Sequence, residues 1–191
     1  MYIFNFLNVS IIVIYLGRRE REKRRKGENI KINRMSKNFI EYIKLKIDKN
    51  YIDVAYNKEN GGLKATHVRH NFDPNRGKYE KEVQEIGFKN GNSIILESEK
   101  GDTIGQKYAD GLWNGKAFDV GTSLGIGQNN IKSILNHARS KNAEIAIIYF
   151  PDKNLYSYER LNKGISKYNG QTKYKFYKII YIVDGNLYEY K

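Results

Sequence analysis

The chain has 191 residues, of which 40% are hydrophobic, so it is long enough for one domain of ordinary size together with extensions. It contains no cysteine, which excludes disulfide bonds, cysteine-based zinc sites and a thiol nucleophile. The formal net charge is +13 and the sequence pI is about 9.6, so the expected partner is anionic, either a nucleic acid or a membrane surface.

Residues 1–34 are predicted to form an N-terminal tail. Residues 2–16 are mostly apolar, but they are fewer than the roughly 20 residues that span a bilayer, and no basic residue precedes them as in a secretory signal. The basic run 18–26 follows directly. A membrane anchor, a remnant of an upstream domain and a true start of translation at Met35 all stay open. The last two together are favoured, and we attach no function to the tail.

Residues 35–60 are predicted to form a helix and a linker. Apolar residues at helical spacing indicate a helix over 36–49, with Ser36 as a candidate N-cap. Residues 51–56 are expected to be extended. The glycine pair at 61–62 interrupts regular structure, so the domain boundary is placed there.

The main domain is expected over residues 61–191. Its first segment, residues 63–74, is polar and basic and is expected to be a loop. His67 and His70 would share a face on a helix and could bind a metal there, but the sequence offers no third ligand nearby. Contact with an anionic ligand, such as a nucleic acid, is the interpretation we keep for these two histidines.

The rest of the chain mixes helical and strand patterns. Helices are predicted over residues 78–90, 129–141 and 158–168. Strands are predicted over residues 93–97, over the two arms of a hairpin within 110–120, and over 144–150, 174–183 and 187–190. The run 144–150 is almost wholly apolar, which is typical of a strand buried on both faces. The predicted fold class is therefore α/β (α+β), with a mixed central sheet flanked by helices.

Two acids in the segment DGLWNGKAFDVG, residues 110–121, carry the chemistry. Asn114-Gly115 predicts a two-residue type I′ hairpin, in which Asp110 faces Asp119. Like charges opposed across strands are destabilising, so a divalent cation or a shared proton is expected to relieve them. Mg²⁺ suits such a pair, because it takes one or two protein carboxylates and completes its shell with waters and phosphate oxygens. A solvated strand end and a turn cap are the alternative roles that spacing leaves open.

Residues near the hairpin are candidates to complete this site. A third acid is expected from the helix 78–90, at Glu82 or Glu85. Three amides open the helix after the hairpin, where free N–H groups favour phosphate: Gln128, Asn129 and Asn130. Asn129 is alternatively the N-cap of that helix.

The order and spacing of these elements resemble a known family. The segments YEKEVQEIGFKNGN, ADGLWNGKAFDVG and NNIKSILNHARSKNAEIAIIYF resemble the C-terminal tRNase toxin domain of contact-dependent growth inhibition proteins, which has a PD-(D/E)XK nuclease-like fold. The lead-in GGLKATHVRHNFDP resembles tails of phage minor head-type and mobile-element proteins that carry this domain. The resemblance covers residues 61–191 and implies the core order αβββαβ, followed here by a C-terminal hairpin.

The resemblance also implies the roles of individual residues. Glu82 and Asp110 match metal-binding acids of the family, and Asp119 matches the acid of the (D/E)XK triplet. Gly121 stands where the triplet has its lysine. Lys132, on the following helix, is expected to substitute for that lysine.

The implied function is a Mg²⁺-dependent ribonuclease, a tRNA-cleaving toxin that acts in the cytoplasm with a cognate immunity protein as partner. Such a protein is delivered as a secreted effector or carried by a phage-type protein. The basic surface, Lys116 included, is expected to contact the nucleic-acid backbone. Because the triplet lysine is missing, two alternatives stay open: a catalytically inactive nucleic-acid-binding or phage-assembly module, and a DNA nuclease.

Overall fold

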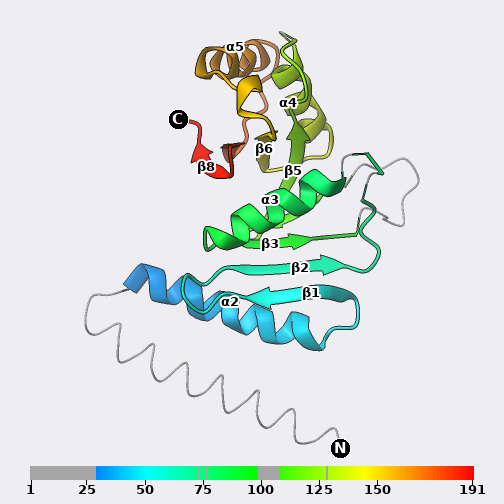
Figure 1. Ribbon diagram of the computed structural model, residues 1–191, viewed down its shortest axis with the longest axis vertical. Coiled ribbons are helices and arrows are strands. Elements are labelled where there is room, and N and C mark those ends of the chain that lie inside the picture. Colours follow the sequence, from blue (N-terminus) through cyan, green and yellow to red (C-terminus); the bar gives the residue numbers. More distant parts are fainter. Residues whose placement is uncertain (1–28, 73, 76, 99–107, 128) are drawn as a thin grey trace, which may run out of the picture.

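The computed structural model describes residues 29–72, 74–75, 77–98, 108–127 and 129–191. Within this part the strands form one eight-stranded sheet, in which every strand lies beside its neighbours in sequence, from β1 to β8 (Figure 1). The predictions for the tail before residue 29 and for Gln128 lie outside the described residues. Among the helices that are described, none is both long enough and apolar enough to cross a membrane.

The elements follow the chain order that the sequence predicts from residue 77 onward. The strands are β1 (Tyr51–Tyr56), β2 (Leu63–His67), β3 (Ser93–Leu96), β4 (Gly111–Trp113), β5 (Lys116–Thr122), β6 (Ile145–Phe150), β7 (Lys178–Val183) and β8 (Asn186–Glu189). The helices are α2 (Asn29–Ile47), α3 (Gly77–Lys89), α4 (Asn130–Ser140) and α5 (Tyr158–Asn169), with the short 3₁₀ turn η1 (Lys153–Leu155). Elements α3 to β6 give the order αβββαβ, and β7 with β8 is the C-terminal hairpin. The predicted fold class is confirmed.

The sheet is mixed, and its most buried strand lies between parallel neighbours. β5, β6 and β7 run parallel, as do β2 and β3, and the remaining pairs are antiparallel. Every residue of β6 is buried. This agrees with the expectation from its continuous apolar sequence, because a parallel strand of this kind is covered by helices on both faces.

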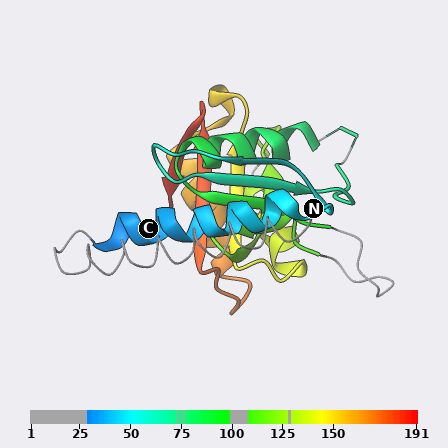
Figure 2. The same ribbon diagram turned by 90° about the horizontal axis from the view of Figure 1, so that it is seen from below.

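Helices cover both faces of the sheet. Val83 of α3 packs in one buried cluster with Trp113 and Phe118 of the central hairpin. On the other face, Leu45 of α2 packs with Leu112. Figure 2 shows α2 and α3 on opposite sides of the strands between them. Since side chains alternate along a strand, α3 covers the face opposite the one that α2 covers.

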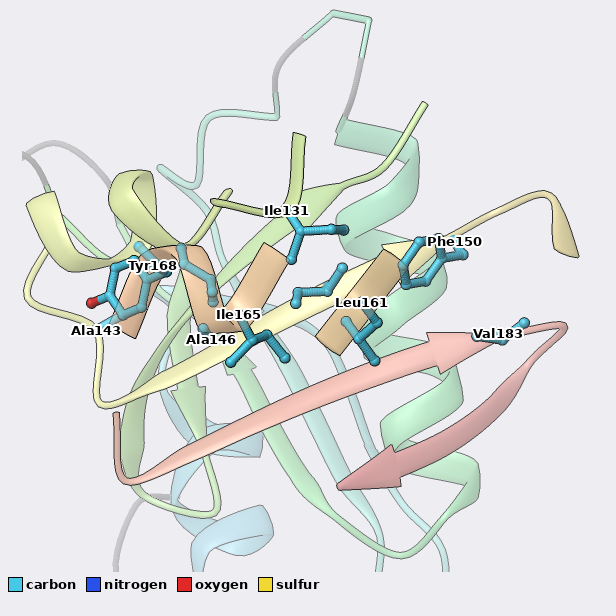
Figure 3. Packing of buried hydrophobic residues seen from close by; sticks show 11 residues of the cluster. Ile131, Ala143, Ala146, Phe150, Leu161, Ile165, Tyr168 and Val183 are labelled. Carbon is cyan, nitrogen blue, oxygen red and sulfur yellow. The ribbon is translucent and has the colours of Figure 1, made fainter. Parts of the chain in front are cut away.

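Helices α4 and α5 cover the same face as α2, over β6 and β7. The apolar stripe of each helix points into one cluster, which Figure 3 shows in close-up. Its buried members are Ile131, Leu135, Ala138, Ala143, Ala146, Ile148, Phe150, Leu161, Ile165, Tyr168 and Val183. Leu161, Ile165 and Tyr168 of α5 are thus core, whereas Tyr158 at the start of the helix is 56% exposed. This packing fixes α4 against the end of the sheet that holds the site.

The central hairpin has the predicted turn. Asn114 has φ = 51° and Gly115 has φ = 81°, so both central residues are left-handed, as a type I′ turn requires. In the resulting register Gly111 lies opposite Phe118. The turn chemistry alone therefore sets which residues of β4 and β5 face each other.

Two predictions near the N-terminal end of the described chain are wrong. Helix α2 begins at Asn29, so Ser36 lies inside it and is not its N-cap; the preceding residues contain no helix breaker and extend the helix. Residues 63–67 form strand β2 and are not a loop, because Leu63 and Ala65 alternate inward with Lys64 between them. This alternation is too short to distinguish from a polar loop by sequence. The glycine pair at 61–62 lies in the turn that joins β1 to β2.

Candidate active site

The hairpin brings Asp110 and Asp119 together on one face. Asp110 lies just before β4, and its main-chain N–H donates at 3.0 Å to the carbonyl of Phe118, the residue that pairs with Gly111, so Asp110 departs from the predicted one-to-one register with Asp119. Both aspartates are buried, with 2% and 1% of their surface exposed. They lie on the face away from Trp113 and Phe118, as the alternation of the strands predicts.

A lysine from the end of α4 neutralises the pair. Lys141 directly follows α4, and its Nζ lies 2.6 Å from Asp110 Oδ1 and 2.8 Å from Asp119 Oδ1. Asp110 Oδ2 accepts the main-chain N–H of Val120 at 2.7 Å, so both oxygens of Asp110 are engaged. Asp119 Oδ1 makes this ionic contact with Lys141 but forms no hydrogen bond among the described residues. Asp119 Oδ2 is buried and also has no hydrogen-bond partner there.

The burial of this cluster changes the protonation of Asp119. Burial first, and then the Asp110 carboxylate, raises the pKa of Asp119 to about 8, although Lys141 opposes the change. Burial by itself lowers the pKa of Lys141, but the two carboxylates outweigh it and hold that pKa above its usual value. Near neutral pH the protonated form of Asp119 is therefore favoured, beside the ammonium group of Lys141.

The cluster forms part of a cleft of about 760 Å³. Its wall combines one face of α4, the end of β5 and the first turn of α3. The lining residues are Asn71, Pro74, Glu80, Asp110, Val120, Gly121, Thr122, Leu124, Asn130, Ser133, Ile134, His137 and Lys141. A larger groove of about 980 Å³ lies at the turn of the hairpin, near Asn114, but neither aspartate lines it. We assign the candidate site to the smaller cleft because Asp110 and Lys141 line it, while Asp119 is buried in contact with Lys141 and does not itself line the cleft.

The shape of the cleft explains why the lysine comes from Lys141. A Cβ atom on Gly121 would overlap the side chain of Ile134, so α4 packs too closely for a side chain at the triplet position. Lys132 does not line the cleft. It lies nine residues before Lys141, about 13 Å along the helix axis, and the C-terminal end of α4 is the end that meets the aspartates. Sequence reasoning missed Lys141 because a basic residue at a helix C-terminus usually only complements the dipole.

Glu82 is not brought to the aspartate pair. It is exposed on α3, the helix that covers the opposite face, and its Oε2 accepts the Tyr149 hydroxyl at 2.7 Å. Within the part of the chain that the structure describes, no three His, Asp or Glu residues are close enough to hold one metal ion. The acid that α3 does present to the cleft is Glu80, closer to the N-terminus of the helix.

The predicted phosphate-contacting amides lie where α4 begins. Asn129 precedes α4, but its side chain makes no capping hydrogen bond. Asn130 lines the cleft, and its Oδ1 is buried without a hydrogen-bond partner among the residues described. One of the described amides therefore lines the same cleft as Asp110 and Lys141.

The other predicted contacts are dispersed. Lys116 pairs with Glu144 at 2.6 Å and lines the larger groove, away from the aspartates. The Nδ1 of His67 accepts the main-chain N–H of Arg69 at 3.0 Å. His70 is buried behind the cleft wall, between the end of β3 and the first turn of α3, and does not line the cleft.

The carboxyl pair fits a divalent cation by the type of its donor atoms. Hard cations such as Mg²⁺ take carboxylate oxygens, and Asp119 Oδ2 is a buried oxygen without a hydrogen-bond partner in the described residues. Asp110 and Asp119 are the residues that would hold such an ion. In the structure, the ammonium group of Lys141 supplies the compensating positive charge.

Comparisons with known proteins give one structural likeness. No protein-family model matches the chain, and no curated protein matches it. Among solved structures, a chain of the "CdiA-CT/CdiI toxin and immunity complex from Burkholderia pseudomallei" is 17% identical, with a TM-score of 0.48, and the alignment covers 66% of this chain and 98% of that chain. A likeness at this level carries no argument about activity, which rests instead on the geometry of the site.

Proposed function

We propose that the protein is a metal-dependent ribonuclease that cleaves tRNA and acts as a toxin effector. The observation that supports this most is the buried Asp110–Asp119–Lys141 cluster in a cleft of about 760 Å³. Buried acids with a perturbed pKa in a cleft mark a functional site more often than chance. The net charge of +13 favours a polyanionic substrate.

Lys141 has a donor left for the substrate. An ammonium group has three N–H donors; Lys141 Nζ donates one to Asp110 Oδ1 and makes an ionic contact with Asp119. A further donor is available to a non-bridging phosphate oxygen, where it stabilises the charge that develops during cleavage. Lys141 thus takes the role that the resemblance assigns to the missing triplet lysine.

The proposed cofactor is Mg²⁺, held by Asp110 and Asp119. When bound, such an ion activates water and neutralises charge on the phosphate. The chain's own residues hold the two carboxylates side by side, exclude water from them, and supply a fixed cation beside them. A cation that binds Asp119 must displace the proton this carboxyl carries near neutral pH.

RNA is the substrate class that the surface favours. Tyr158, Tyr177 and Tyr188 are 56%, 62% and 45% exposed, and exposed aromatic rings stack on unpaired bases. The resemblance of residues 61–191 to tRNase toxin domains supports tRNA, cytoplasmic action and a cognate immunity protein. A small acidic protein encoded directly downstream that binds this chain and blocks cleavage would be that partner.

The substitution Asp110→Asn tests the ribonuclease. We expect at least about a 100-fold loss of tRNA cleavage in the presence of Mg²⁺, because Lys141 and the cation both lose a ligand. Gel analysis of tRNA and of single- and double-stranded DNA measures the activity and separates a ribonuclease from a DNA nuclease. The exposed Glu59→Gln in the β1–β2 turn is the control, and circular dichroism checks folding. Undiminished cleavage by Asp110→Asn would exclude this site.

A second function, binding without cleavage, is favoured by one observation. The Nζ of Lys141 already lies within 2.8 Å of one oxygen of each carboxyl group, as in an ion cluster that has only a structural role. A binding module on this scaffold gives salt-sensitive association with RNA or DNA and no cleavage product with Mg²⁺, Mn²⁺ or Ca²⁺. Cleavage by the wild-type protein with any of these metals would exclude it.

A further inference from the structure

A buried histidine lies directly behind the wall of the cleft. The side chain of His70 is fully buried, and its two ring nitrogens contact residues from two different elements. Nδ1 lies 2.6 Å from the main-chain carbonyl oxygen of Glu97, just after β3. Nε2 lies 2.8 Å from Oε2 of Glu80, in the first turn of α3. His70 therefore joins the end of a strand to the helix that forms one side of the cleft.

The acceptors around His70 determine where its protons lie. A carbonyl oxygen only accepts, so Nδ1 carries a proton and donates it to Glu97. The contact between Nε2 and the Glu80 carboxyl then contains one further proton. With that proton on Nε2, the pair is an imidazolium and a carboxylate, and the attraction of two full charges in a buried site favours this form.

The other groups around the pair agree with a positive His70. The Glu97 carboxylate accepts the Tyr51 hydroxyl at 2.9 Å and 3.0 Å, so it is held on the β1 side. The edge of the Phe72 ring packs against the imidazole with ring centroids 4.6 Å apart. Lys81 of α3 lies over the Phe72 ring, 4.4 Å from its centroid. Thus the acids near His70 favour its charged form, and the Phe72 ring contacts both His70 and Lys81.

Glu80 faces the substrate space, while His70 does not. Glu80 lines the cleft with 14% of its side chain exposed, on the α3 side, and Lys141 lines it from α4. Within the described ranges no three His, Asp or Glu residues could share one metal ion, so Glu80 stands apart from the aspartate pair. A carboxylate that is fixed in orientation and separate from the cation site has the properties of a proton acceptor.

We propose that Glu80, held in orientation by its contact with the buried His70 ring, is the general base of the cleft. This inference rests on the proposed nuclease function. Glu80 is the catalytic residue and His70 is a positioning residue. Together they give the cleft a second functional wall, in which the sequence had indicated only His70, as a contact for an anionic ligand.

The reaction step balances without an additional reactant. A water molecule in the cleft gives a proton to the free oxygen of the Glu80 carboxylate, while its oxygen forms a bond to phosphorus. The bond from phosphorus to one bridging ester oxygen breaks, and that oxygen takes a proton from solvent. Lys141, on the other wall, faces the non-bridging oxygen that gains charge.

The first test compares Glu80→Gln with Glu85→Gln, the same change on the same helix. Glu85 pairs with Lys64 outside the cleft, so its variant is the matched control. We expect Glu80→Gln to lower the kcat of tRNA cleavage at least about 100-fold with little change in KM or in RNA affinity, and to remove the low-pH limb of the pH–rate profile. Unchanged kcat or an unchanged profile overturns the base role.

The second test measures the protonation of His70, beside Glu80, in the absence of substrate. Nitrogen-15 NMR of the histidine rings reports whether His70 carries one proton or two at pH 7. We expect two in the wild-type protein, and one in Glu80→Gln, where the amide leaves His70 without its carboxylate. A singly protonated His70 in the wild type overturns the ion pair. If the wild type cleaves no nucleic acid at all, the proposed function and the base role both fail; cleavage that persists in Glu80→Gln overturns the base role alone.

Discussion

Asp119 is the residue on which both stability and chemistry depend. It is 1% exposed, it neighbours a second carboxyl, and one of its oxygens has no hydrogen-bond partner in the described residues. Burial without full compensation is costly for a charge, so the folded state favours the protonated form. A site of this kind lowers the stability of the fold, and it places a carboxyl group where a cation can bind.

The stability of the protein is expected to fall as pH rises from about 4 to about 8. The pKa of Asp119 is raised from its ordinary 3.8 to about 8, so the folded state binds more protons than the unfolded state across this window. The favourable contribution is complete below the unfolded pKa and is lost as pH rises through the folded one. Urea unfolding between pH 4 and pH 9 measures it.

Asp119→Asn isolates this effect. Asparagine cannot ionise, so the variant should show a flatter dependence of unfolding free energy on pH and should be more stable than the wild type at pH 9. An identical slope in the two proteins would show that Asp119 is ionised in the folded state throughout.

At the scale of elements, α4 decides how the site is completed. Its apolar stripe packs on β6 and α5, which places Ile134 directly over Gly121 and carries Lys141 to the aspartate pair. The hairpin contributes both acids because a two-residue turn fixes its register. The cluster of charges is thereby assembled from the hairpin and the C-terminal end of the helix that follows it in the chain.

Restoring the triplet lysine by Gly121→Lys is expected to harm the protein. The new side chain would overlap Ile134, and overpacking of this kind costs about 1–3 kcal/mol. Thermal unfolding should show the loss, and tRNA cleavage should not increase, since Lys141 already holds the position. A stable Gly121→Lys protein with higher activity would mean that the triplet position is open to a side chain.

At the scale of the molecule, positive charge is the dominant property. Thirty-four basic residues face 21 acidic ones, and many of the acids are already paired with lysines. Attraction of a polyanion therefore does not depend on the few residues of the cleft. In the function that we propose, this charge would bring any nucleic acid to the surface, and the cleft would then select the bond to be cut.

Binding of tRNA is expected to weaken steeply with salt. For about six phosphate contacts, counterion release predicts about a 10³-fold loss of affinity between 50 and 200 mM salt. Fluorescence anisotropy with Asp110→Asn, which should not cleave the probe, measures the slope. Affinity that does not change with salt would show that the net charge plays no part in binding.

Local rules in the sequence determined the hairpin, the helices α3 to α5 and the buried strand β6. The Asn114-Gly115 turn sets a register by backbone conformation alone, and an apolar period of 3.6 or a continuous apolar run depends only on near neighbours. For that reason the placement of Asp110 and Asp119 on the same hairpin follows from the amino-acid sequence by itself, although Asp110 lies outside the β4–β5 strand pairing.

Only the tertiary structure decided what surrounds that pair. Lys141 and Glu80 both line the cleft because the C-terminal end of α4 and the first turn of α3, which cover opposite faces of one sheet, both reach it. No local sequence pattern encodes that approach. Likewise, β2 is a strand because β1 and β3 lie beside it, not because its five residues look like one. Contacts between side chains of distant elements depend on how the helices and the sheet pack in the core. A single sequence determines that packing only through all of its residues together, so local patterns do not reveal it.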